Sequence, residues 1–148
     1  MKQSWMTLQE RQLILLLRWW VGLFAATAIV FAIFPNEVIY WINTIGLVIF
    51  RWPHKLLPAP SEHFWQILSV SLLIVLAVVA YLAQHDIREN LSYVKLIIIS
   101  KLATVTGFVM AFVLDGAYFA YLAGFVADLI IFLLTWFCYR RTRSSRAL

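Results

Sequence analysis

Two oppositely charged residues stand inside runs that are otherwise apolar. Lys101 interrupts "IIISKLATVTG", and Asp128 lies in "GFVADLIIF". An ionised side chain at the centre of a bilayer costs roughly 2.5–3.5 kcal/mol on insertion scales, so each is expected to have a partner. Asp115-Gly116 is a turn signal between the runs. Lys101 and Asp128 lie about fourteen and about twelve residues from it, a depth difference of about 3 Å at 1.5 Å per helical residue. The sequence therefore predicts an intramembrane charge pair between Lys101 and Asp128.

Such a pair allows two kinds of chemistry. Intramembrane ionisable residues often mark proton or ion pathways. One pair in a small bundle can equally join two helices, and we interpret Lys101 and Asp128 first in this way. Arg18 also lies inside an apolar run. Its long side chain is expected to reach the headgroups, and the alternative is that it joins the pair.

The sequence lacks the residue patterns that other catalytic or cofactor chemistry would require. The sequence contains no phosphate-binding glycine loop, no metal-ligand spacing and no nucleophile set beside a base. Ser100 adjoins Lys101, but neighbouring helical residues point about 100° apart. The single cysteine, Cys138, excludes an intrachain disulfide and a multi-cysteine metal site. We therefore predict no enzyme activity, no metal and no cofactor.

The histidines do not change this prediction. They stand at the boundaries of the apolar runs, on opposite sides, at His54, His63 and His85. A haem held by this chain alone would need two axial ligands at one depth, on facing helices. The alternative that a single histidine of this chain is a ligand to a cofactor held by a partner protein remains open.

The elements that must position these residues are membrane spans. Of the 148 residues, 64% are hydrophobic and 13% are charged, whereas soluble domains are nearer one half and one quarter. The apolar residues gather into runs of the length, about 20 residues, that crosses a bilayer. We predict spans at 13–34, 64–84, 93–114 and 117–139. The first run is too long for a signal-peptide core and is expected to be a permanent span. The fold class is all-α, an integral membrane four-helix bundle forming one domain over 1–148.

A fifth, shorter apolar segment lies between the first two spans, at 36–51. Its polar residues recur at helical spacing, so we predict an amphipathic helix in the membrane interface. A re-entrant or protein-buried segment is the alternative. Its apolar side is expected to touch lipid or a partner subunit through Ile39, Trp41, Ile42, Ile45 and Phe50.

Small residues recur at helical spacing in the last two spans. Such residues let a neighbouring backbone approach closely. Ala120 and Gly124 in the fourth span, and Ala103 and Gly107 in the third, are therefore predicted to pack helix against helix.

Most basic residues lie at or near the same ends of the spans. They are Lys2, Arg11, Arg18, Arg88, Lys95, Arg140, Arg141, Arg143 and Arg146, against Arg51 and Lys55 on the other side. The positive-inside rule then predicts cytoplasmic termini. Because the basic residues flank spans, nucleic-acid binding is not expected.

In size and organisation the chain resembles small bacterial inner-membrane proteins such as the DoxX-like group. The resemblance implies a location in the cell inner membrane and identifies no site residue. The leading functional hypothesis is a non-catalytic accessory or scaffold subunit of a larger membrane complex, with lipids and other subunits as partners. The alternatives are a small transporter or proton-handling protein that uses Lys101 and Asp128, and a module that binds a quinone or lipid.

Overall fold

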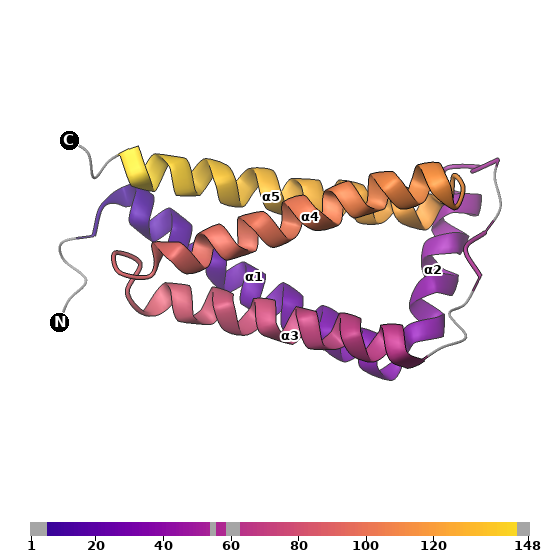
Figure 1. Cartoon of the computed structure of the whole chain (residues 1–148), viewed down its shortest axis with the longest axis horizontal. Helices are drawn as coiled ribbons and strands as arrows, with labels where there is room; N and C mark the ends of the chain where they lie inside the picture. Colours follow the sequence, from indigo (N-terminus) through magenta and orange to yellow (C-terminus); the bar gives the residue numbers. More distant parts are fainter. Residues whose placement is uncertain (1–5, 54–55, 59–62, 145–148) are drawn as a thin grey trace.

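The computed structural model describes residues 6–53, 56–58 and 63–144. This part of the chain forms helices and no strand. The helices are α1 (Leu8–Ile33), α2 (Pro35–Val48), α3 (His63–His85), α4 (Leu91–Leu114) and α5 (Phe119–Ser144) (Figure 1). All but α2 are long and apolar enough to cross a membrane. The predicted fold class, an all-α bundle of four long apolar helices with one extra helix, is confirmed.

The long helices extend beyond the predicted spans where polar residues continue them. α1 begins at Leu8, five residues before the predicted 13, because Thr7 and Glu10 form a capping box that starts the helix in its polar part. α5 continues to Ser144, past the predicted end at 139, through a basic last turn. Basic side chains there interact favourably with the helix dipole. Lys2, His54, Lys55 and Arg146 lie outside the described residues.

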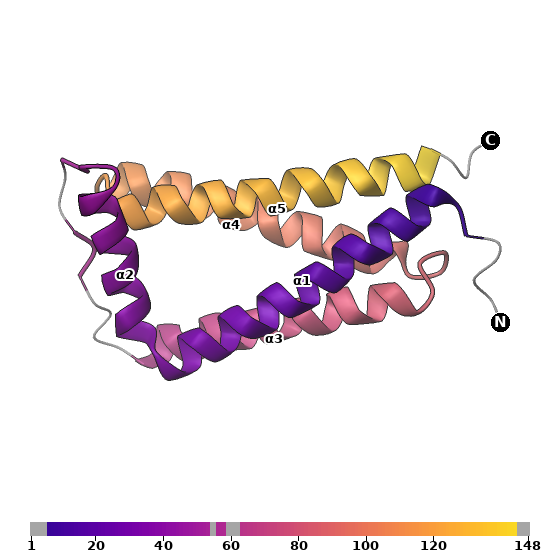
Figure 2. The ribbon, with the colours of Figure 1, turned by 180° about the vertical axis from the view of Figure 1, so that it is seen from behind.

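The long helices form two pairs, α1 with α3 and α4 with α5. Figure 1 shows the pairs close together where α1 begins and α5 ends, and apart where α2 crosses between them. Figure 2 shows the same divergence from behind. The turn between α4 and α5 was expected at Asp115-Gly116, and Gly116 there has φ +133°, which favours glycine. The short link makes α4 and α5 antiparallel neighbours.

The bundle divides into two halves that differ in packing. We call 8–24, 80–85, 91–105 and 128–144 the closed half, and 25–33, 63–79, 106–114 and 119–127 the open half. Side chains from all four long helices form one core in the closed half, including Leu17, Ala83, Ile97 and Ile131. Within the open half as described, Ala28 and Phe119 alone are buried.

α2 crosses the end of the bundle where the two helix pairs are apart, and it contacts both pairs there. Pro35 begins the helix, a position that proline favours because its missing N–H would have no helical partner. Gly46 lies against Phe119 of α5, where an added Cβ would come 2.7 Å from the ring. The amide of Asn43 donates to the Leu57 carbonyl and accepts from the Leu57 N–H. α2 runs across the ends of the long helices (Figure 1), the direction of an interfacial helix if these cross a membrane.

Candidate functional site

Lys101 of α4 and Asp128 of α5 lie side by side. The Lys101 Nζ is 2.7 Å from Asp128 Oδ1, and the side chains are 7% and 14% exposed. The Thr104 hydroxyl, one turn beyond Lys101, donates to the other carboxylate oxygen, Oδ2. Both oxygens of the carboxylate therefore have a donor. Such pairing removes most of the cost of placing either charge in an apolar interior.

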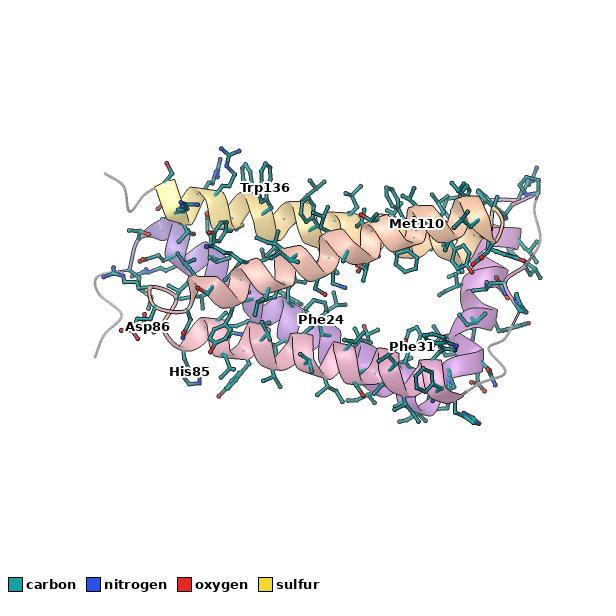
Figure 3. The ribbon with its side chains drawn as sticks, in the orientation of Figure 1. Phe24, Phe31, His85, Asp86, Met110 and Trp136 are labelled. Carbon is teal, nitrogen blue, oxygen red and sulfur yellow. The ribbon has the colours of Figure 1, made fainter. Side chains whose placement is uncertain are left out.

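The ammonium group also faces an aromatic ring from α1. Lys101 Nζ lies 5.0 Å from the centre of the Phe24 ring, a distance at which the face of an aromatic ring attracts a cation. Figure 3 shows Phe24 between the two helix pairs, where they begin to diverge. The charge pair therefore lies at the boundary between the closed and open halves and joins three helices.

A second polar contact supports the same junction. Trp20 lies one turn before Phe24, and its indole N–H donates to the hydroxyl of Thr135 on α5 at 2.9 Å. Thr135 in turn donates to the Ile131 carbonyl of its own helix at 2.6 Å. Both partners are buried, so this bond fixes the spacing of α1 and α5 beside the charge pair.

The chemistry open to this site is limited. A lysine and a carboxylate can exchange a proton, but a relay needs further titratable groups in line. Asp128 is the one acidic residue of the sequence within the predicted spans. In the described ranges, no three His, Cys, Asp or Glu side chains come together as a metal would require. The site can hold three helices together, or take part in a single proton exchange.

Arg18 lies elsewhere. Its side chain is exposed, and with Arg11, Gln84 and His85 it lines a groove between α1 and α3. Arg18 is therefore not part of the charge pair, and its reach to the headgroups stays a prediction.

The small residues divide into those that pack and those that do not. A Cβ on Gly124 would lie 2.5 Å from the Phe108 ring of α4, so Gly124 allows that ring to approach. Ala120 is half-buried on the same helix. Ala103 and Gly107, in contrast, are exposed, and no atom lies within 4 Å of the Cβ position of Gly107. Within the described residues, Ala103 and Gly107 are therefore not close contacts between helices, and their expected role in helix packing stays a prediction.

The reason is the direction in which α4 faces. Its inward stripe is Lys101, Val105 and Phe108, at steps of four and three residues. Ala103 and Gly107 lie on a different side of the helix. The spacing of Lys101, Val105 and Phe108 is the sequence signal that could have indicated the inward side of α4. This signal is weak, because a helix that is apolar on all sides shows little difference in hydrophobicity between its faces.

The predicted contact residues of α2 are split between its two sides. Trp41 and Ile45 are exposed, and Ile39 and Ile42 are half-buried. Phe50, just beyond the helix, is exposed but its ring lies 5.1 Å from that of Phe119. Part of this surface therefore packs on α5, and the rest faces outward.

Sequence reasoning missed a second ion pair, at the far end of the closed half. Glu10 is 1% exposed, and its carboxylate accepts from Arg88 Nε at 3.1 Å. Arg88 lies in the α3–α4 loop, and this hydrogen bond and charge attraction raise the pKa of its guanidinium. The capping-box pattern in "TLQE" was the available signal for Glu10.

Comparison of the chain with protein-family models, with curated proteins and with solved structures gave no match.

Proposed function

We propose that this membrane protein is a non-catalytic accessory or scaffold subunit of a larger complex in a bacterial inner membrane. One observation carries the proposal: half of the bundle has no shared core of its own. α3 has no buried residue before Ala80, and α4 has none after Val105. A small stable bundle would be expected to close along its whole length, since interiors pack as densely as organic crystals.

A transmembrane partner would fit the open half better than disordered lipid. Helices associate in membranes through close packing and hydrogen bonds, because lipid tails are as apolar as leucine. Ala103 and Gly107 are exposed on α4 where the closed half meets the open half. They would allow a helix from another subunit to approach closely there. The Lys101–Asp128 pair would then hold α4, α5 and α1 at a fixed spacing for that partner.

The distribution of basic residues supports cytoplasmic termini. At the end of the bundle where α1 begins and α5 ends lie Arg11, Arg88, Lys95, Arg140, Arg141 and Arg143, whereas Arg51 follows α2 at the opposite end. Positively charged residues favour the cytoplasmic side of a membrane.

Proton handling is the second candidate. Its support is the place of the charge pair, at the boundary of the open half, with the Asp128 side chain 14% exposed. Quinone binding has weaker support. The described apolar pocket between α4 and α5, lined by Phe108, Phe112 and Phe125 among others, holds about 150 Å³. Ligand pockets usually hold about 300–1,000 Å³.

The test is extraction of the full-length protein in mild detergent, followed by native mass measurement. The subunit proposal expects a stable assembly that contains other proteins, far larger than the 17.2 kDa chain. A variant with Gly107→Ile should lose that assembly and still fold, because its side chain points into open space. Gly22→Ile is the matched control and should keep it, because Gly22 is exposed in the closed half and a Cβ added there also meets no atom within 4 Å. A lone 17.2 kDa chain in wild type would overturn the proposal.

A further inference from the structure

The groove that contains Arg18 has the features of an anion site at a membrane surface. It holds about 600 Å³ and lies between the first turns of α1 and the last turn of α3. Its polar walls are Arg11, Arg18, Gln84 and His85, and its apolar walls include Ile14 and Leu15. No carboxylate is among these lining residues, and Arg18 contributes a positive charge to the groove.

Arg18 is the residue that most needs an explanation. It lies ten positions into α1 and five residues into the predicted span, which is about 7.5 Å along the helix. Within the part of the chain that the structure describes, no hydrogen bond or ion pair involves Arg18. A guanidinium at that depth is stabilised when an anion reaches it, and its planar fork matches the oxygens of a phosphate.

The remaining walls of the groove fit a lipid and not a free anion. Arg11 and Arg18 are seven residues apart, so both lie on one side of α1 with Ile14 and Leu15 between them. Leu15 is 57% exposed, and an acyl chain can lie along it toward the middle of the helix. Basic pockets between transmembrane helices are known to bind acidic lipid headgroups.

We propose that this groove binds the phosphodiester headgroup of an anionic phospholipid, with Arg18 as its main phosphate ligand and Gln84 and His85 as hydrogen-bonding groups on the opposite wall. The lipid would seal the outer side of the α1–α3 pair in the closed half. The assignment is independent of whether the protein is a subunit of a complex.

The test is native mass spectrometry of the full-length protein in a neutral detergent, titrated with phosphatidylglycerol or with phosphatidylcholine of identical acyl chains. We expect tighter retention of phosphatidylglycerol. Arg18→Gln should weaken it about fivefold, the factor that corresponds to about 1 kcal/mol per basic residue near an anionic surface. His85→Phe, which keeps a ring and removes its hydrogen-bonding nitrogens, should weaken it about threefold, the effect of one hydrogen bond.

Two controls remove the same unit charge outside the groove. Lys95→Gln on α4 and Arg141→Gln on α5, at exposed positions, should change retention less than twofold. Equal retention of both lipids by wild type would overturn the proposal, and so would an equal loss in the controls. Soluble glycerol phosphate should not displace the lipid at equal concentration. Displacement would mean that the groove takes a free phosphate, and would also overturn the lipid assignment.

Discussion

The closed and open halves of the bundle contain similar apolar residues but use them differently. In the closed half, four helices share a core, and polar contacts tie them together at Glu10–Arg88, Trp20–Thr135 and Lys101–Asp128. In the open half, the helix pairs part and α2 spans the space between their ends (Figure 1). Hydrophobicity alone therefore does not close a bundle of this kind. Specific polar pairs and close contacts decide where helices meet.

The largest expected effect comes from breaking the charge pair at the boundary of the two halves. Asp128→Asn leaves Lys101 buried without its anion, and breaking a buried pair costs about 3–5 kcal/mol in soluble proteins. In a membrane we expect the lower end of this range, about 3 kcal/mol, because polar interactions there are weaker. Steric trapping in bicelles would measure the free energy of unfolding.

The double variant Lys101→Met with Asp128→Leu sharpens this test. Replacement of both charges by apolar residues can be nearly neutral, so the double variant should be more stable than either single one. Additive single effects would show that the two residues are not in contact. A double variant that folds but abolishes biological activity would favour proton handling over the scaffold role.

The next effect compares two glycines on the facing helices. Gly124→Ala places a Cβ 2.5 Å from the Phe108 ring, and overpacking of this kind costs about 1–3 kcal/mol. Gly107→Ala meets no atom within 4 Å and should be neutral or stabilising by up to about 1 kcal/mol, because alanine favours helices. Equal losses in the same unfolding measurement would contradict the outward position of Gly107 on α4.

A smaller effect is expected from hydroxyl groups. Thr135→Val removes the acceptor of the buried Trp20 indole and should cost about 1–2 kcal/mol. Thr106→Val is the control, since the exposed Thr106 hydroxyl only donates to the Leu102 carbonyl of its own helix. Its expected change is below about 0.5 kcal/mol. Near-ultraviolet circular dichroism should also report a changed tryptophan environment in Thr135→Val alone.

The smallest expected effect is on the pH dependence of stability, through the Glu10–Arg88 ion pair at the end of the closed half. Glu10 raises the pKa of Arg88, so the stabilising contribution of the ionised arginine is complete below the ordinary arginine pKa and is lost only as pH rises through the higher, folded-state value. Arg88→Gln should therefore leave the shape of the stability profile between about pH 6 and 9 unchanged. A new transition in that range would contradict this expectation.

The sequence by itself determined the helices and the positions of the charged residues along them. Runs of apolar residues define the four long helices, and the constant rise per residue fixes how far Lys101 and Asp128 lie from Gly116. Those two quantities are local, so they can be read without knowing which helices touch. The polar spacing between the first two runs likewise indicated α2.

Only the tertiary structure decided which sides of the helices face inward. Four features depend on the fit of side chains from separate helices. They are the pairing of α1 with α3, the outward position of Ala103 and Gly107, the Trp20–Thr135 bond and the groove at Arg18. In a soluble protein, the contrast between polar and apolar faces would have indicated much of this. Here both faces of each long helix are apolar, so the sequence carries little contrast, and shape complementarity makes the choice.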